Sequence, residues 1–171
     1  MKIEYSIDEA TLQLEKSRAW NTLSLTEFLI CFESQIELSD TTKKSVMVLK
    51  EVPLLGFSAD IVDGIAKVST GGMAEFTSFY GTYNMKIEAG AETSVKITDT
   101  FSNQVISAYL PEIKLAICDF VDKSNRDVKD KISKLIENPK ILNFLSELRN
   151  RACVHRRTPI AGSTITTTKT A

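Results

Sequence analysis

The hydrophobic residues of this 171-residue chain change their spacing near residue 100, and this change is the strongest constraint on the fold. Between residues 46 and 98, apolar residues mostly alternate with polar ones, as in strands that rest one face on a core. After Phe101 they recur at intervals of three and four, as in amphipathic helices. The chain therefore predicts an α+β fold, in which an antiparallel β meander with an N-terminal helix precedes a C-terminal antiparallel helical segment.

The same change of spacing predicts how the chain is divided. We expect an α+β sheet region over residues 1–100, a helical region over residues 101–157 and a flexible Thr-rich tail over residues 158–171. The tail contains too few apolar residues to fold by itself.

Within the first region, alternation at residues 3–7 predicts a strand, and a capping box at Ser24–Glu27 predicts a helix over residues 25–38. Alternation from Phe57 to Ile61 leads to Asp63-Gly64, a dipeptide that favours a two-residue turn, so a hairpin returning through residues 65–69 is expected.

Later in the meander, residues 83–87 are expected to pair with residues 95–97 across a turn at residues 89–92. In the helical region, Pro111 suits the first turn of a helix ending near Asp122, and Ser124 can cap a second helix. Asn138-Pro139 predicts the start of a third helix.

Composition favours a reducing, aqueous compartment. No apolar run approaches the roughly 18 to 20 residues that span a bilayer, and the N-terminus lacks the pattern of a signal peptide. Cys31, Cys118 and Cys153 are odd in number and scattered, which argues against a disulfide framework and against a cysteine zinc site. We therefore expect a cytoplasmic protein without metal or cofactor.

Charge is distributed unevenly along the chain. Residues 1–50 carry a formal charge of −2, residues 51–122 carry −6 and residues 123–171 carry +7. One interpretation is that the opposite patches attract each other or are simply solvated. The other is that the basic end meets phosphates while the acidic body faces a basic partner.

The predicted third helix ends in a group of residues suited to phosphate chemistry. Arg149-Asn150 is followed, after four residues, by His155, the only histidine of the chain. Histidine exchanges protons near neutral pH, and arginine offers a permanent charge with a planar fork that matches phosphate oxygens. Such a pair can assist attack of a ribose 2′-hydroxyl on the adjacent phosphate without a metal.

This arrangement resembles the signature of HEPN ribonucleases and their RNA-binding relatives, which occur in toxin–antitoxin systems and anti-phage defence. The resemblance covers about residues 103–157, and its specific part is Arg149, Asn150 and His155. It implies a metal-independent endoribonuclease or RNA-binding protein, in which Asn150 positions the catalytic pair and two chains form a composite site as a homodimer. The neighbouring Arg151, Arg156 and Arg157 would bind the RNA.

Three other interpretations stay open. Arginines at a helix C-terminus complement the helix dipole, so this motif also fits a solvated helix end. Alternatively, the acidic sheet, including Asp60, Asp63 and Glu75, is a protein-binding surface that neutralises a basic partner, as in an immunity protein or antitoxin. A small-molecule pocket between sheet and helices is a third possibility, without a residue signal of its own.

Overall fold

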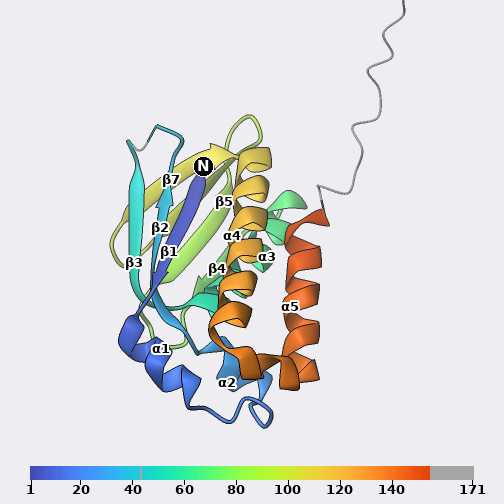
Figure 1. Cartoon of the computed structure of the whole chain (residues 1–171). Coiled ribbons are helices and arrows are strands. Elements are labelled where there is room, and N and C mark those ends of the chain that lie inside the picture. The colour runs from blue at the N-terminus through green and yellow to red at the C-terminus, as the bar shows by residue number, and fades with distance from the viewer. Residues whose placement is uncertain (43, 155–171) are drawn as a thin grey trace, which may run out of the picture.

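The computed structural model describes residues 1–42 and 44–154, and they form the expected α+β fold (Figure 1). The helix α3 packs between a four-stranded sheet and the helices α4 and α5, and α4 also contacts β1 of a second sheet. In chain order the elements are β1 (Lys2–Ile7), α1 (Glu9–Lys16), α2 (Leu25–Leu29), β2 (Glu33–Ser39), β3 (Val46–Pro53), α3 (Leu54–Ser69), β4 (Ala74–Thr77), β5 (Asn84–Ala89), β6 (Ser94–Asp99), β7 (Gln104–Tyr109), α4 (Leu110–Lys131), the 3₁₀ helix η1 (Ser133–Glu137) and α5 (Pro139–Ala152). Among the described residues, no helix has the length and apolar character needed to cross a membrane.

The strands form two antiparallel sheets, in the orders β1-β2-β3 and β4-β5-β6-β7. The predicted strand at residues 3–7 and the predicted pairing of residues 83–87 with residues 95–97 are confirmed, the latter with Ile87 opposite Ile97. The two sheets meet where β3 lies beside β7, and there the backbone N–H of Val48 donates to Oε1 of Gln104 at 3.0 Å. The strands therefore share one continuous core with the helices.

The hairpin predicted at residues 57–69 is wrong, because this segment is the helix α3. Its apolar residues serve a helix equally well, since Phe57, Ile61 and Ile65 are spaced four apart and all three are buried. Gly64 is not a turn residue. A Cβ atom added there would come within 2.6 Å of Cδ1 of Ile87, so the glycine lets α3 approach β5 closely.

The helix predicted over residues 25–38 is also wrong beyond its first turn. The capping box at Ser24 and Glu27 is present, but α2 ends at Leu29 and the chain continues as β2. Phe32 adopts a left-handed backbone conformation with φ at 61°, which interrupts the helical path. In β2, Ile36 and Leu38 are fully buried on the core side, as the alternation of a half-buried strand requires.

Two predictions in the region after residue 100 need correction. The strand β7 lies beyond the expected boundary at residue 100 and pairs with β6. The helices expected on either side of Asp122 are one continuous helix, α4, because Ser124 does not act as a cap. Ser124 is fully buried within α4, and its hydroxyl donates to the carbonyl of Val121 at 3.2 Å.

The third predicted helix is confirmed as α5, with Asn138 as its cap and Pro139 in its first turn. Oδ1 of Asn138 accepts hydrogen bonds from the first backbone N–H groups of α5, and its Nδ2 donates to the carbonyls of Trp20 and Leu23. One side chain thus both starts α5 and ties it to the loop after α1. Helices α4 and α5 run antiparallel, as their short connection predicts (Figure 1).

Candidate functional site: the groove between α4 and α5

The last turn of α5 presents the arginine and asparagine of the predicted site at the surface. Arg149 and Asn150 are both exposed, and α5 ends at Ala152. His155, Arg156 and Arg157 lie outside the described residues, so the geometry of the histidine with Arg149 stays a prediction. Because the helix ends before His155, helical spacing does not determine where that imidazole lies.

The two arginines of this turn contact different helices. Nε of Arg149 donates to Oδ1 of Asp122 on α4 at 2.5 Å, whereas Arg151 forms an ion pair with Asp63 on α3. Arg149 therefore belongs to the α4–α5 side of the molecule. Arg151, expected to bind RNA beside it, points to the α3 side.

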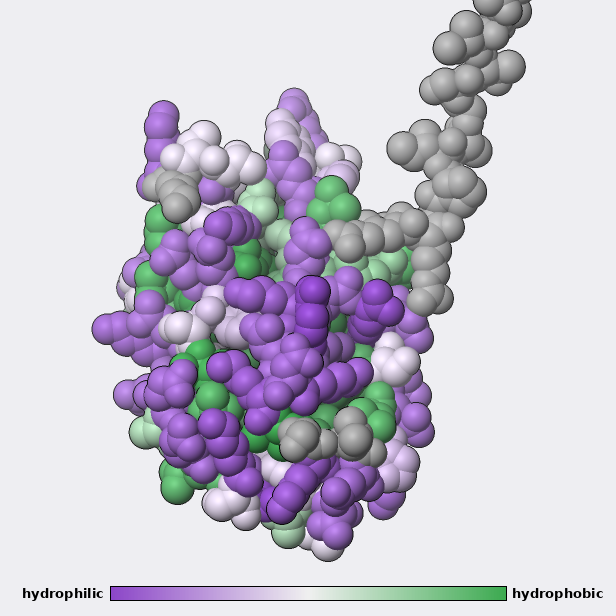
Figure 2. Space-filling model, viewed as in Figure 1, coloured by the Kyte–Doolittle hydropathy of each residue, from purple (hydrophilic) through white to green (hydrophobic). Residues whose placement is uncertain are grey.

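Between α4 and α5 lies a polar groove with a volume of about 500 Å³, which we call the α4–α5 groove. The face of the molecule over these two helices is strongly hydrophilic (Figure 2). Three cationic side chains line the groove: Arg126 and Lys129 from α4, and Arg149 from α5. Its remaining lining residues are Asp122, Asn125, Asp130, Leu145 and Ser146.

The floor of the groove holds a buried polar group with an unused acceptor. Asn125 is only 5% exposed, and its Nδ2 donates to the carbonyl of Leu145 at 2.9 Å. Its Oδ1 accepts no hydrogen bond from the part of the chain that the structure describes. A buried acceptor in this state costs free energy unless another molecule donates to it. Oδ1 of Asn125 is therefore an unsatisfied acceptor that lies beneath the surface of the groove.

The hydrophobic spacing of α4 itself contains a signal for Asn125. Asn125 follows Val121 by four residues and precedes Val128 by three, so it lies on the buried stripe of α4. A polar residue at an apolar position of a helix marks either a hydrogen bond across the core or a ligand contact. Here the amide nitrogen makes the hydrogen bond to α5, and the oxygen has no hydrogen-bond donor among the described residues.

The expectation of no disulfide is wrong. Cys118 of α4 and Cys153, which ends α5, form a disulfide that links residues 35 positions apart, with their Cα atoms 4.9 Å apart. An odd, scattered set of cysteines does not show which two the fold will bring together. Cys31 remains a buried free thiol, and burial raises its pKa to about 12, so this group is not a reactive thiolate.

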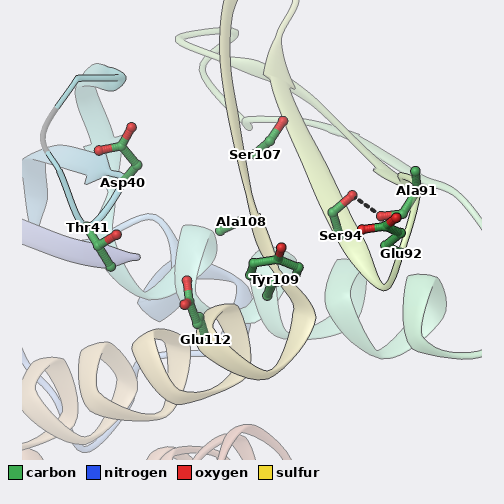
Figure 3. A pocket seen from close by; sticks show the side chains of 9 residues that line it. All are labelled: Asp40, Thr41, Ala91, Glu92, Ser94, Ser107, Ala108, Tyr109 and Glu112. Carbon is green, nitrogen blue, oxygen red and sulfur yellow. Dashed lines mark hydrogen bonds between the residues drawn. The ribbon is translucent and has the colours of Figure 1, made fainter.

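The opposite charge gathers in a second depression, the acidic hollow, with a volume of about 400 Å³ (Figure 3). Asp40 after β2, Glu92 in the β5–β6 turn and Glu112 in the first turn of α4 line it from three directions. Asp40 accepts hydrogen bonds from the backbone N–H groups of residues 42, 44 and 45, and Glu112 lies 3.5 Å from the N-terminal ammonium group. The carboxylates of Asp40 and Glu112 thus already have local partners.

The acidic surface expected from Asp60, Asp63 and Glu75 does not exist as one sheet surface. Asp60 and Asp63 lie on α3 rather than at a hairpin turn, and Glu75 lies on β4. Asp60 is half-buried, and its carboxylate accepts a hydrogen bond from the hydroxyl of Tyr83 at 3.0 Å. Burial raises the pKa of Asp60, which the Tyr83 hydrogen bond partly offsets.

No protein-family model, no curated protein and no solved structure matches the chain.

Proposed function

We propose that the α4–α5 groove binds single-stranded RNA. The observation that carries the proposal is the unused Oδ1 of Asn125 on the floor of a groove lined by three cationic side chains. Single-stranded RNA combines the two features that this groove can use, a chain of phosphates and a regular supply of hydroxyl donors.

Charge supports an anionic ligand. Arg126 and Lys129 are exposed on successive turns of one side of α4, and Arg149 faces them from α5. Asp122 already accepts from Arg149, so Arg126 and Lys129 are the side chains expected to meet phosphates first. The groove also belongs to the segment of residues 123–171, which carries +7 and would raise the local concentration of a polyanion.

Hydrogen-bonding chemistry supports RNA over DNA. Oδ1 of Asn125 is an acceptor and needs a donor, and the ribose 2′-hydroxyl is a donor that deoxyribose lacks. Because its amide nitrogen donates to the carbonyl of Leu145, the oxygen is held in a fixed orientation. A site with a fixed acceptor discriminates against a ligand that cannot donate to it.

Cleavage is the further step that the HEPN resemblance suggests, with Arg149 stabilising the phosphorane, His155 moving the proton and Asn150 positioning them. For the described residues we propose RNA binding alone. A test of cleavage is therefore a separate arm, in which RNA is incubated with chelator and products are compared between the wild type and His155→Ala. Loss of cleavage with retained binding in the variant would extend the proposal to an endoribonuclease, for which the HEPN resemblance implies a homodimer with a composite site.

The binding proposal is tested by titrating a fluorescent single-stranded RNA and measuring anisotropy at several salt concentrations. The charge-reversed variant Arg126→Glu/Lys129→Glu should bind at least about tenfold more weakly. If two phosphate contacts are lost, the slope of log affinity against log salt should fall by about 1.4, since each contact on a single strand contributes roughly 0.7.

The matched control is Lys86→Glu/Lys96→Glu, which changes the net charge equally but lies on β5 and β6. This control should bind within about threefold of the wild type, because screening weakens charges beyond a Debye length of roughly 10 Å. Equal loss of RNA affinity in both variants would show that binding follows net charge alone and would overturn the groove assignment.

A DNA of the same sequence should bind more weakly than the RNA, and Asn125→Leu should narrow the difference in affinity between RNA and DNA.

A second candidate function is the capture of a protein with a basic surface. The acidic hollow is a better contact surface for such a partner than the residues Asp60, Asp63 and Glu75. Three carboxylates from separate elements face this depression. Charge complementarity of this kind sets association rate and partner choice. Glu92→Lys/Glu112→Lys should abolish capture of a basic partner if this candidate is correct, and should leave RNA binding by the groove unchanged.

A further inference from the structure

We propose that Cys118, Cys153 and Asp122 form a redox-controlled zinc site, which is closed when the cysteines are joined as a disulfide and binds Zn²⁺ when they are reduced. This inference goes beyond RNA binding and does not depend on it. Its basis is the convergence of two sulfurs and one carboxylate at the place where the end of α5 meets α4.

The three ligand atoms already converge on one place in the structure. The Sγ atoms of Cys118 and Cys153 and a carboxylate oxygen of Asp122 all lie within 4.8 Å of one another. Ligands at Zn–S distances of about 2.3 Å and Zn–O distances of about 2.1 Å are about 3.5 to 3.8 Å apart in a tetrahedron. Once the disulfide is opened, small side-chain rotations therefore suffice to place the three atoms around one ion.

Secondary structure holds these groups in place. Cys118 and Asp122 are four residues apart on α4, so their side chains leave the same face of the helix one turn apart. Cys153 is fixed at the end of α5, where its backbone N–H donates to the carbonyl of Arg149. The site is therefore built on two packed helices rather than on a mobile loop, which lowers the entropy cost of ordering the ligands.

The surroundings of the three groups also fit a metal site. Cys118 is fully buried and Cys153 is 9% exposed, whereas the side chain of Asp122 is 22% exposed and leaves a route for the ion. Arg149 donates to Oδ1 of Asp122, and metal-bound carboxylates in proteins are commonly oriented by such a hydrogen bond. Two thiolates among the ligands favour a thiophilic ion such as Zn²⁺ over Mg²⁺ or Ca²⁺.

The chemistry balances with a dithiol as the reductant. Two electrons and two protons from the dithiol convert the Cys118–Cys153 disulfide into two thiols, and the dithiol becomes its own disulfide. Zn²⁺ then displaces the two thiol protons to solvent and forms two Zn–S bonds and one Zn–O bond to Asp122, and water completes the tetrahedron. Oxidation of the two thiolates by a disulfide reverses the sequence and releases the ion.

The test compares zinc uptake by the oxidised and reduced full-length protein. After reduction and removal of the reductant without oxygen, the wild type should bind one equivalent of Zn²⁺ in competition with a chromogenic chelator, and the oxidised protein should bind none. Co²⁺ in place of Zn²⁺ should give the thiolate-to-metal absorption band of a tetrahedral site. This spectroscopic signature reports sulfur ligation directly and does not depend on the stability of the fold.

Variants separate this site from nonspecific uptake. Asp122→Asn should weaken zinc binding at least about tenfold, since loss of even an outer partner of a metal ligand typically costs that much. Asp119→Asn, on the same helix, and Cys31→Ser should bind zinc as the wild type does. Uptake that is equal in the oxidised and reduced protein, or unchanged in both Asp122→Asn and Cys153→Ser, would overturn the proposal, as would a cobalt spectrum without the thiolate band.

Discussion

The α4–α5 groove and the acidic hollow carry opposite charge, and they are also held together differently. The groove lies between two helices that are joined by a disulfide and by the Arg149–Asp122 ion pair. The hollow lies between the turn after β2, the β5–β6 turn and the first turn of α4. In the β5–β6 turn the backbone of Glu92 adopts a positive φ of 51°. Its order comes from short-range hydrogen bonds such as those made by Asp40.

The two depressions also differ in whether their polar groups already have hydrogen-bond partners. Asp40 and Glu112 of the hollow already accept hydrogen bonds or ion pairs from nearby groups. The groove keeps a buried acceptor, Oδ1 of Asn125, without a donor among the described residues. A buried polar atom is normally satisfied in a folded protein, so an unused one beside a polar groove requires an explanation that surface charge does not.

The largest expected effect concerns the disulfide, which crosslinks the groove and has no counterpart at the hollow. Cys118→Ser/Cys153→Ser should lower the free energy of unfolding by about 3 kcal/mol, because the bond closes a loop of 35 residues and restricts the unfolded chain. Urea unfolding of the oxidised wild type and the variant, with a metal chelator present, measures this loss. Reduction should bring the wild type to the level of the variant, and identical midpoints for all three would contradict the prediction.

The next effect concerns the floors of the two depressions. Asn125→Asp should lower the free energy of unfolding by about 2 kcal/mol, because it removes the donor to the carbonyl of Leu145 and places a carboxylate at a buried position. Ser107→Asp introduces the same group at an exposed position of the hollow and should cost about 0.5 kcal/mol or less. Equal costs, measured by urea unfolding, would remove the distinction between a buried and an exposed floor.

A smaller effect is expected from the ion pair across the groove. The Arg149 side chain is 61% exposed, so its pair with Asp122 should contribute about 0.5 kcal/mol to stability. A double-mutant cycle with Arg149→Gln and Asp122→Asn measures the coupling. A value above about 2 kcal/mol would mean that the ion pair fastens the two helices to a degree comparable with the disulfide.

The smallest effect is a pH dependence at the hollow. Burial opposes ionisation of Asp40, but hydrogen bonds from Thr42, Ser45 and Lys44 outweigh it and hold its pKa below the ordinary value of 3.8. A depressed pKa in the folded state stabilises the protein above about pH 4, and this contribution is lost as pH falls through the folded-state pKa. Asp40→Asn should therefore destabilise the protein at neutral pH and converge with the wild type in acid, as followed by circular dichroism. A constant difference across this range would show that the carboxylate charge is not responsible.

Local signals in the sequence identified the elements whose starts and turns are determined by side chains close by in the chain. The Asn138-Pro139 start of α5 and the capping box at Ser24 depend on side chains within one helical turn, and both are present. The β5–β6 hairpin likewise follows from alternation and a short turn between neighbours in the chain. Arg149 and Asn150 were located correctly at the end of a helix for the same reason.

Local signals gave wrong predictions where an element packs against neighbours on more than one side. The helix α3 contacts a sheet on one side and α4 on the other, so its buried stripe is wide, and the apolar residues at positions 57, 59 and 61 also alternate as in a strand. Gly64 then resembled a turn residue, although its role is close packing against Ile87. The continuity of α4 past Ser124 has the same cause, since a buried serine returns its hydroxyl to the helix backbone.

By itself the sequence determined the fold class, the start of α5, the β5–β6 hairpin and the placement of positive charge after residue 122. Each of these depends on interactions between residues close in the chain or on composition. Only the tertiary structure decided that Cys118 meets Cys153, that Arg149 pairs with Asp122 and that Asn125 forms the floor of a groove. These contacts join α4 to α5 across 20 to 35 residues, and no local spacing specifies which partners a packed interior brings together.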